Sequence, residues 1–160
     1  MLYEKGIVSM HKKFIKESNA DAILNSKTSD RFEAHSAGSR PANQVNPLAV
    51  KVMQEVNVDL SKKKPESAEK YLDVKFDFVI TLCDKMKEEC PNFPGHPIVA
   101  HWGMPNPDEK EGSEEIKIKE FRKIRNEILK RINLFINLRM DKLDRLTMES
   151  KTKEIGINQE

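Results

Sequence analysis

The sequence predicts an α/β domain with a four-stranded parallel sheet flanked by helices on both faces. Three observations lead to this fold class. Strand-like apolar segments alternate with helix-like segments, which is typical of parallel β/α proteins. The best strand, residues 76–83, is apolar at most positions, as expected of a central strand buried on both faces. The 160 residues suffice for one domain with a real core.

The N-terminal half contains two predicted strands and two predicted helices. Residues 1–10 are weakly strand-like, because charged residues and a glycine interrupt the apolar positions. Residues 12–27 are predicted to form a helix with a thin apolar stripe, and residues 32–35 a short strand. The next helix spans 47–58 and begins at Pro47, where a missing N–H costs nothing.

The C-terminal half continues the alternation. Strand 76–83 is followed by a short strand at 97–102. Ser113 is predicted to cap the last helix, which we expect to run to about Met148 and to end in a frayed tail, residues 151–160. An apolar stripe at helical spacing faces the core: Phe121, Ile124, Ile128, Ile132 and Phe135.

The predicted domain covers residues 1–137, with residues 1–19 atypical, and residues 138–160 are predicted as a helical extension and tail. Within the extension, residues 138–146 are read either as an oligomerisation helix or as a solvated continuation. Ligands of parallel α/β sheets bind where the strands end. The predicted ends should therefore ring one crevice: residues 10–11, 36–38, 83–84 and 102–106.

Composition excludes several function classes. The chain has 28 Lys+Arg and 26 Asp+Glu, a net charge of +2, which gives no argument for nucleic acid. It has no apolar run of roughly 20 residues and no signal peptide at its start, so we expect a cytoplasmic protein that does not contact membranes. Its two cysteines are free thiols, a redox pair or part of a metal site. Together with His35 and His101 they lack the spacing of a compact zinc module, so no metal or cofactor is predicted.

Six sequence segments carry a family resemblance. In order, they are F-E-A-H-S-A-G-S-R-P (32–41), V-N-P-L-A-V-K-V-M (45–53), F-D-F-V-I-T-L-C-D (76–84), C-P-N-F-P-G (90–95), H-W-G-M-P-N-P (101–107) and F-R-K-I-R-N-E-I (121–128). Together they resemble the thioredoxin-coupled arsenate reductases, which share the fold of the low-molecular-weight phosphotyrosine phosphatases. The resemblance covers residues 32 to about 135, and residues 20–25 look like the family's first helix.

This resemblance implies a definite chemistry. In the family, a Cys-x5-Arg loop after the first strand cradles an oxyanion between backbone N–H groups and a bidentate Arg. The same field lowers the pKa of the Cys, whose thiolate attacks arsenic or phosphorus. An Asp before a Pro protonates the leaving oxygen. In the reductases, two further cysteines relay electrons through successive disulfides, and thioredoxin finally reduces the protein.

Three of the positions that the resemblance assigns to this chemistry are changed. Counting back without gaps from Ala20, the nucleophile position is Met10 and the Arg position is Lys16. The thioether of methionine cannot act as an attacking thiolate. Lysine keeps the positive charge but cannot form the bidentate hydrogen bonds of an arginine guanidinium. The acid position before Pro107 is Asn106, and Asp108 is the alternative proton donor, displaced by two residues.

The two later cysteines are kept. Cys83 and Cys90 have six residues between them, as in the reductases, and the resemblance makes them a redox pair. From the residues alone they also fit a packed strand-end thiol and an ordinary loop thiol.

Three accounts of the changed site remain open. In the first, the chain is a degenerate member of the family that keeps the fold and has lost the oxyanion chemistry. In the second, a frameshift or a wrong start altered residues 1–19. In the third, an altered site works with Cys83 as the nucleophile. Two further alternatives are a non-catalytic module that binds an anion such as arsenate or phosphate, or a protein partner, and a protein like the low-molecular-weight tyrosine phosphatases.

Overall fold

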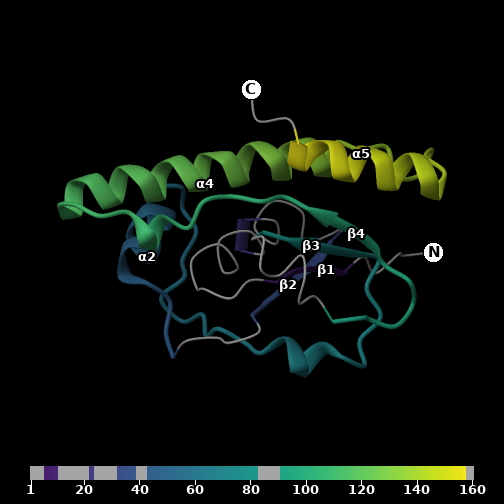
Figure 1. The fold of residues 1–160 in the computed structure, drawn as a ribbon, viewed down its shortest axis with the longest axis horizontal. Coiled ribbons are helices and arrows are strands. Elements are labelled where there is room, and N and C mark those ends of the chain that lie inside the picture. The colour runs from purple at the N-terminus through teal and green to yellow at the C-terminus, as the bar shows by residue number, and fades with distance from the viewer. Residues whose placement is uncertain (1–5, 11–21, 24–31, 39–42, 83–90, 158–160) are drawn as a thin grey trace.

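The computed structural model describes residues 6–10, 22–23, 32–38, 43–82 and 91–157. Within them, four strands form one fully parallel sheet in the order β2-β1-β3-β4 (Figure 1). This confirms the predicted four-stranded parallel sheet. The strands are β1 (Gly6–Met10), β2 (Glu33–Ala37), β3 (Phe78–Thr81) and β4 (Ile98–His101).

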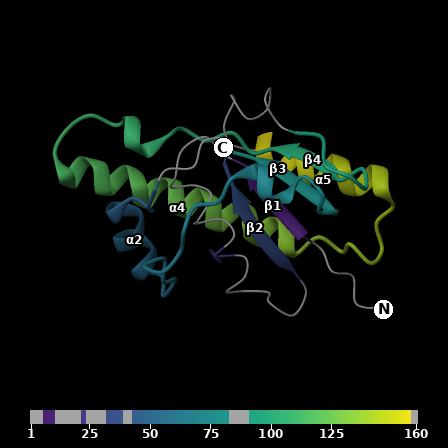
Figure 2. The same ribbon diagram turned by 90° about the horizontal axis from the view of Figure 1, so that it is seen from below.

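Helices flank this sheet. The α-helices are α2 (Pro47–Gln54), α4 (Glu114–Ile136) and α5 (Arg145–Ile157). Two 3-10 helices are η1 (Ala68–Tyr71) and η2 (Pro107–Glu109). Helices α4 and α5 run along one side of the sheet (Figures 1 and 2), and η1 packs on the opposite side. Within the described part of the chain, no helix is long and apolar enough to cross a membrane.

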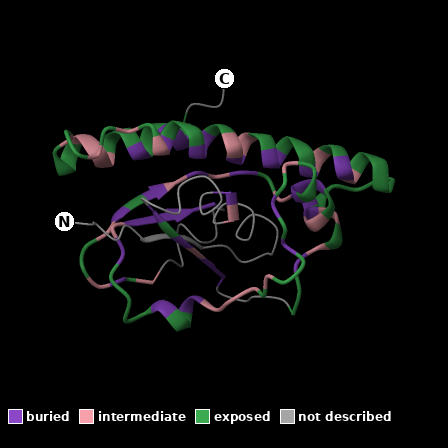
Figure 3. Cartoon of the chain, turned by 180° about the vertical axis from the view of Figure 1, so that it is seen from behind, coloured by how far each residue is buried: buried purple, intermediate pink, exposed green. Residues whose placement is uncertain are grey.

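Each face of the sheet has its own core, and β3 contributes to both. Phe78 and Ile80 point into the larger core, which lies under α2, α4 and α5, and Val79 points into the smaller one. The buried stripe of α4 faces the sheet while its outer side is exposed (Figure 3). The smaller core consists of Ala37, Ala68, Tyr71, Phe76, Val79 and Phe93. This two-sided burial explains why β3 is nearly continuously apolar.

An aromatic cluster forms the centre of the larger core. The fully buried Phe135 packs its ring against Phe78, Phe32 and Trp102, at centroid distances of 5.1, 5.7 and 5.8 Å. These partners come from β3 and from the segments next to β2 and β4. One side chain of α4 therefore holds the helix against three parts of the sheet layer.

Side-chain caps fix where α2 and α4 begin. The Asn46 side chain accepts a hydrogen bond from the Leu48 N–H at 2.8 Å, and Pro47 occupies the first helical position. The Ser113 hydroxyl accepts from the Ile116 N–H at 3.4 Å at the start of α4. Both predicted helix starts are confirmed.

The predicted course of the C-terminus is wrong in two respects. Helix α4 ends at Ile136 rather than near Met148, and residues 138–144 form turns instead of a helix. Residues 145–157 then form α5, so most of the segment expected to be a frayed tail is a packed helix. Asp144 caps α5 by accepting a hydrogen bond from the Thr147 N–H at 2.9 Å, and this bond lowers the pKa of its carboxyl.

Helix α5 docks on the end of β4 through small residues. Thr152 and Gly156 are buried there. The Trp102 indole N–H donates to the Thr152 carbonyl at 2.9 Å, in a buried hydrogen bond. A side chain at position 156 would place its Cβ 2.1 Å from the His101 carbonyl oxygen, so only glycine permits this approach.

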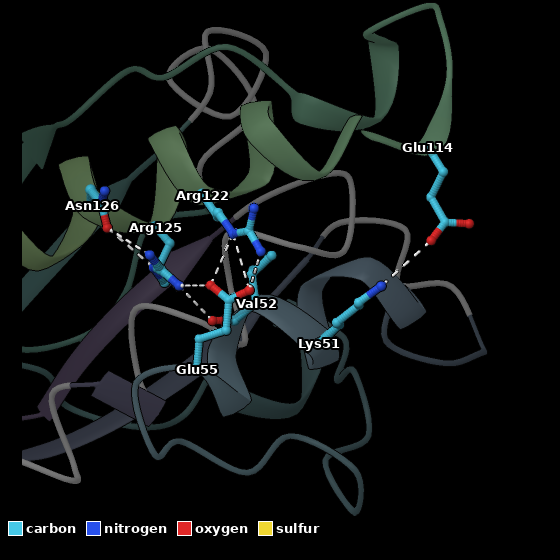
Figure 4. Close-up of polar contacts among 7 residues, drawn as sticks. All are labelled: Lys51, Val52, Glu55, Glu114, Arg122, Arg125 and Asn126. Atoms are coloured by element: carbon cyan, nitrogen blue, oxygen red, sulfur yellow. Dashed lines mark hydrogen bonds and ion pairs between the residues drawn. The ribbon is translucent and has the colours of Figure 1, made fainter. Parts of the chain in front are cut away.

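A charged cluster joins α2 to α4 (Figure 4). Glu55, just after α2, accepts hydrogen bonds from Arg122 Nε at 3.0 Å and from Arg125 Nη1 at 2.7 Å. Arg125 Nη1 also donates to the Val52 carbonyl at 2.7 Å. Hydrogen bonds from Arg122 and then Arg125 lower the pKa of Glu55 from 4.5 to about 2. Glu55 is therefore ionised throughout the neutral and mildly acidic range.

This pKa predicts an acid-dependent loss of stability. Because folding lowers the pKa of Glu55, its contribution is complete above pH 4.5 and declines as the pH falls toward 2. We expect Glu55→Gln to lower the free energy of unfolding at pH 7, and this difference from wild type to shrink between pH 4.5 and 3. Urea unfolding at several pH values measures it. Glu115→Gln, at an exposed position of α4, is the matched control and should show no such trend. A pH-independent difference for Glu55→Gln would contradict the assignment.

Candidate functional site at the carboxyl edge of the sheet

The carboxyl end of β1 lies in the middle of the sheet edge. Met10, its last residue, pairs with Ala37 of β2 on one side and Thr81 of β3 on the other. The structure describes β1 through its backbone. Among the predicted site residues, Lys16, Cys83 and Cys90 lie outside the described residues.

Beside β1, the ends of β3 and β4 are held together past the last strand residues. Thr81 Oγ1 lies 2.8 Å from His101 Nδ1. The Trp102 N–H donates to the Thr81 carbonyl at 2.8 Å, and the Met104 N–H to the Leu82 carbonyl at 3.0 Å. The backbone that follows β3 is thus held by hydrogen bonds up to Leu82, the residue before Cys83. His101 is half-buried at this edge of the sheet.

The side chain of Asn106 is hydrogen-bonded to residues of its own loop. Its side-chain oxygen accepts from the Asp108 N–H at 3.2 Å, and its Nδ2 donates to Glu109 Oε1 at 3.2 Å, so it caps η2. Asp108, the alternative proton donor, accepts from Asn46 Nδ2 at 2.7 Å. This bond ties the loop to the start of α2. The amide of Asn106 carries no acidic proton for general-acid chemistry.

Sequence reasoning missed Arg131 of α4. Its side chain is 1% exposed, and it donates from Nε to Glu127 at 2.8 Å and from Nη1 to the Gly103 carbonyl at 3.4 Å. It therefore supports the loop that follows β4. Its burial could have been predicted from its position, because Arg131 lies three residues after Ile128 and four before Phe135, on the buried stripe of α4.

His35 lies in the middle of β2 and not at its end. Its Nε2 is 3.0 Å from the Glu33 carboxylate, and its ring packs against Tyr71 at 5.3 Å. It is a half-buried side chain beside the smaller core. Among the described residues, no three His, Cys, Asp or Glu side chains gather in a way that suits a metal ion.

Residues 12–149 match the sequence profile of the low-molecular-weight phosphotyrosine protein phosphatases. The chain belongs to this family. The chain is also similar in sequence to arsenate reductases of this family, as the six sequence segments predicted. The arsenate reductase of Halalkalibacterium halodurans is 40% identical over 106 residues, covering 66% of this chain and 76% of that protein. The arsenate reductase of Bacillus subtilis is 36% identical over 106 residues, with the same coverage.

Solved structures confirm the phosphatase-family fold. An arsenate reductase in an oxidised state superposes with a TM-score of 0.68 at 21% identity, covering 81% of this chain and 94% of that one. An arsenate reductase in a phosphate-binding state gives a TM-score of 0.63 at 20% identity, with the same coverage. The low-molecular-weight tyrosine phosphatase of T. tengcongensis gives 0.66 at 18% identity, covering 81% and 95%.

Proposed function

We propose that this protein is a degenerate member of the arsenate reductase branch, in which the thioredoxin-coupled reduction of arsenate to arsenite is absent or severely impaired. One observation carries the proposal. The chain has two cysteines, Cys83 and Cys90, so neither β1 nor the segment that follows it in the sequence contains a cysteine. The sheet register supports the assignment of that end as the old nucleophile position, because Met10 lies between β2 and β3 at the ligand-binding edge.

Two further substitutions support the loss. Lys16 offers a point charge where the family pattern has an arginine fork, so it attracts an oxyanion without orienting it. Asn106 caps η2 with both ends of its amide and supplies no proton to a leaving oxygen. A nucleophile, a clamp and an acid are thus replaced together.

We further propose that Cys83 and Cys90 remain a redox pair served by thioredoxin. In this step the thioredoxin dithiol gives two electrons and two protons to a Cys83–Cys90 disulfide, which becomes two thiols. In support, the residue before Cys83 is held in the sheet layer, because the Leu82 carbonyl accepts a hydrogen bond from the Met104 N–H at 3.0 Å. No metal or organic cofactor is needed for this exchange.

The alternative is a module that binds an oxyanion or a protein partner without turnover, or a protein with the tyrosine phosphatase type of activity. The chain's similarity to an arsenate reductase solved in a phosphate-binding state favours an anion over other ligands. Isothermal titration with phosphate, arsenate and arsenite tests binding, and hydrolysis of an aryl phosphate tests phosphatase activity.

The deciding experiment is a thioredoxin-coupled assay of arsenate turnover. We expect no turnover above background for the wild type, and the same for Cys83→Ser. Because the attacking thiolate is missing, the loss should be complete rather than partial. Turnover by the wild type that Cys83→Ser abolishes would overturn the proposal and would make Cys83 the nucleophile of an altered site. The arsenate reductase of Bacillus subtilis serves as the positive control.

A further inference from the structure

Strand β4 is at the edge of the described sheet, with β3 as its neighbour. The N–H groups of Ile98 and Trp102 point toward β3, where each donates to a backbone carbonyl at 2.8 Å. Backbone groups alternate in direction along a strand, so those of Val99 and His101 point away from β3. The outer edge of β4 therefore presents backbone donors and acceptors to which a further strand could pair.

Helix α5 lies along this outer edge (Figures 1 and 2). Just before β4, the His96 carbonyl accepts a hydrogen bond from Arg145 of α5. At the end of β4, Gly156 lies against the His101 carbonyl, because a Cβ at this position would be 2.1 Å from the oxygen. Helix α5 therefore contacts both ends of β4 and occupies the side on which a further strand would pair.

The docking of α5 depends on few apolar contacts. Its buried residues are Thr152, Ile155 and Gly156. Among them Ile155 has the one large apolar side chain, and Met148 adds partial burial. Two further apolar side chains of α5, Leu146 and Ile157, are 79% and 75% exposed. Because α4 buries a full stripe of Ile and Phe side chains, α5 is the more easily released of the two helices.

Release of α5 would leave an edge suited to strand pairing. Residues 138–144 form turns between the two helices, so α5 can move while α4 stays in place. Strand β4 contains no Lys, Glu or Pro, the residues that block pairing at sheet edges, and its Ile98, Val99 and Ala100 are uncharged. A second copy of the chain offers the same edge, so two β4 strands can pair antiparallel about a two-fold axis.

We propose that α5 is a releasable cover of β4, and that the released edge pairs with β4 of a second copy. Docked α5 keeps the chain monomeric, and loosening of α5 converts the chain to a dimer. The proposal uses no property of the oxyanion site and does not depend on the function proposed above.

Native-state hydrogen exchange of the full chain tests the release. We expect the amides of residues 152–156 to exchange through an opening at least about tenfold more populated than that of residues 124–132 of α4, and less dependent on urea. Equal opening with equal urea dependence would show that α5 opens only when the whole domain unfolds. Exchange as fast as in an unfolded chain would show that α5 covers nothing. Either result would overturn the proposal.

Sedimentation velocity at several protein concentrations tests the pairing. We expect Gly156→Ala, whose Cβ forces α5 away from His101, to dimerise at least about tenfold more tightly than the wild type. Lys151→Ala, on the exposed side of α5, is the control and should sediment as the wild type does. Trp102→Phe keeps an aromatic ring but removes the hydrogen bond to Thr152, and should lie between the two.

A second pair of variants locates the dimer interface. In the Gly156→Ala background, Val99→Lys adds a charge to the edge of β4, and charged side chains at an edge prevent strand pairing. Leu134→Lys is the matched control, because Leu134 lies on α4 and both residues are 46% exposed. We expect Val99→Lys to restore wild-type sedimentation and Leu134→Lys to leave the dimer intact.

Two results would contradict the pairing. One is a Gly156→Ala protein that is folded by circular dichroism and sediments as the wild type does. The other is a dimer on which Val99→Lys and Leu134→Lys have the same effect, which places the interface away from β4. The arsenate assay is unaffected by both results, so failure of this proposal is distinct from failure of the proposed function.

Discussion

Replacing Phe135 with alanine is expected to lower the free energy of unfolding by about 3–5 kcal/mol. Phe135 is fully buried and packs on three aromatic rings from the sheet layer. The substitution removes apolar contact and leaves a cavity that rigid neighbours fill poorly. Since domains of this size are stable by about 5–15 kcal/mol, the loss is a large share of the total. Urea unfolding followed by circular dichroism measures it.

The adjacent residue provides the control for Phe135. Leu134 is 46% exposed on the outer side of α4, so Leu134→Ala should change stability by no more than about 0.5 kcal/mol. Phe135→Leu, which keeps most of the volume, should lie between the two. Equal effects of the two alanine substitutions would show that the aromatic cluster does not hold α4 on the sheet.

Replacing Gly156 with alanine is expected to destabilise the protein by about 1–3 kcal/mol. At an ordinary helix position this change stabilises by about 1 kcal/mol, because alanine is the better helix former. Here the added Cβ would lie 2.1 Å from the His101 carbonyl oxygen and 2.8 Å from Trp102 Cδ1. Helix α5 must move away from β4 to make room for this Cβ. The substitution is therefore expected to lower stability here, whereas it raises stability at an ordinary helix position.

Fluorescence reports this movement directly. Trp102 is the single tryptophan, and its indole donates to Thr152 of α5. We expect a red-shifted emission in Gly156→Ala as water reaches the ring. Lys151→Ala, on the exposed side of α5, is the matched control and should leave both emission and stability unchanged. A more stable Gly156→Ala protein with wild-type emission would contradict the close approach.

Elements with a strong periodic pattern could be predicted from the sequence. The apolar run at 76–83 contains β3, because a strand buried on both faces cannot alternate. The stripe ending at Phe135 is the buried side of α4, and Pro47 and Ser113 mark real helix starts. In each case local chemistry and tertiary packing agree.

Helix α5 escaped prediction for a physical reason. It docks through Thr152, Ile155 and Gly156, of which one is strongly apolar, so its sequence lacks the stripe that marks an amphipathic helix. Its contact with the sheet depends on a missing side chain and on a hydrogen bond from Trp102 to a backbone carbonyl. Neither feature has a periodic signature.

The site was only partly predictable from the sequence. The identities of Met10, Lys16 and Asn106 can be read directly from the sequence. The capping role of Asn106 cannot, because it depends on where Asp108 and Glu109 lie in the folded chain. Residues 62–64 line a cleft beside β2. Their cleft exists because the chain returns to Gly38, a contact between distant segments that no local pattern contains.

The position of β1 has a consequence for how such a protein changes over evolutionary time. β1 is hydrogen-bonded on both sides, so its removal would leave β2 isolated from a two-stranded β3-β4 pair. Two strands alone are marginally stable. Selection for a folded chain therefore preserves the backbone of β1 whether or not a reaction takes place at its end, while the side chains beyond it are free to drift. The backbone of β1 is therefore required for the fold independently of any reaction at its end.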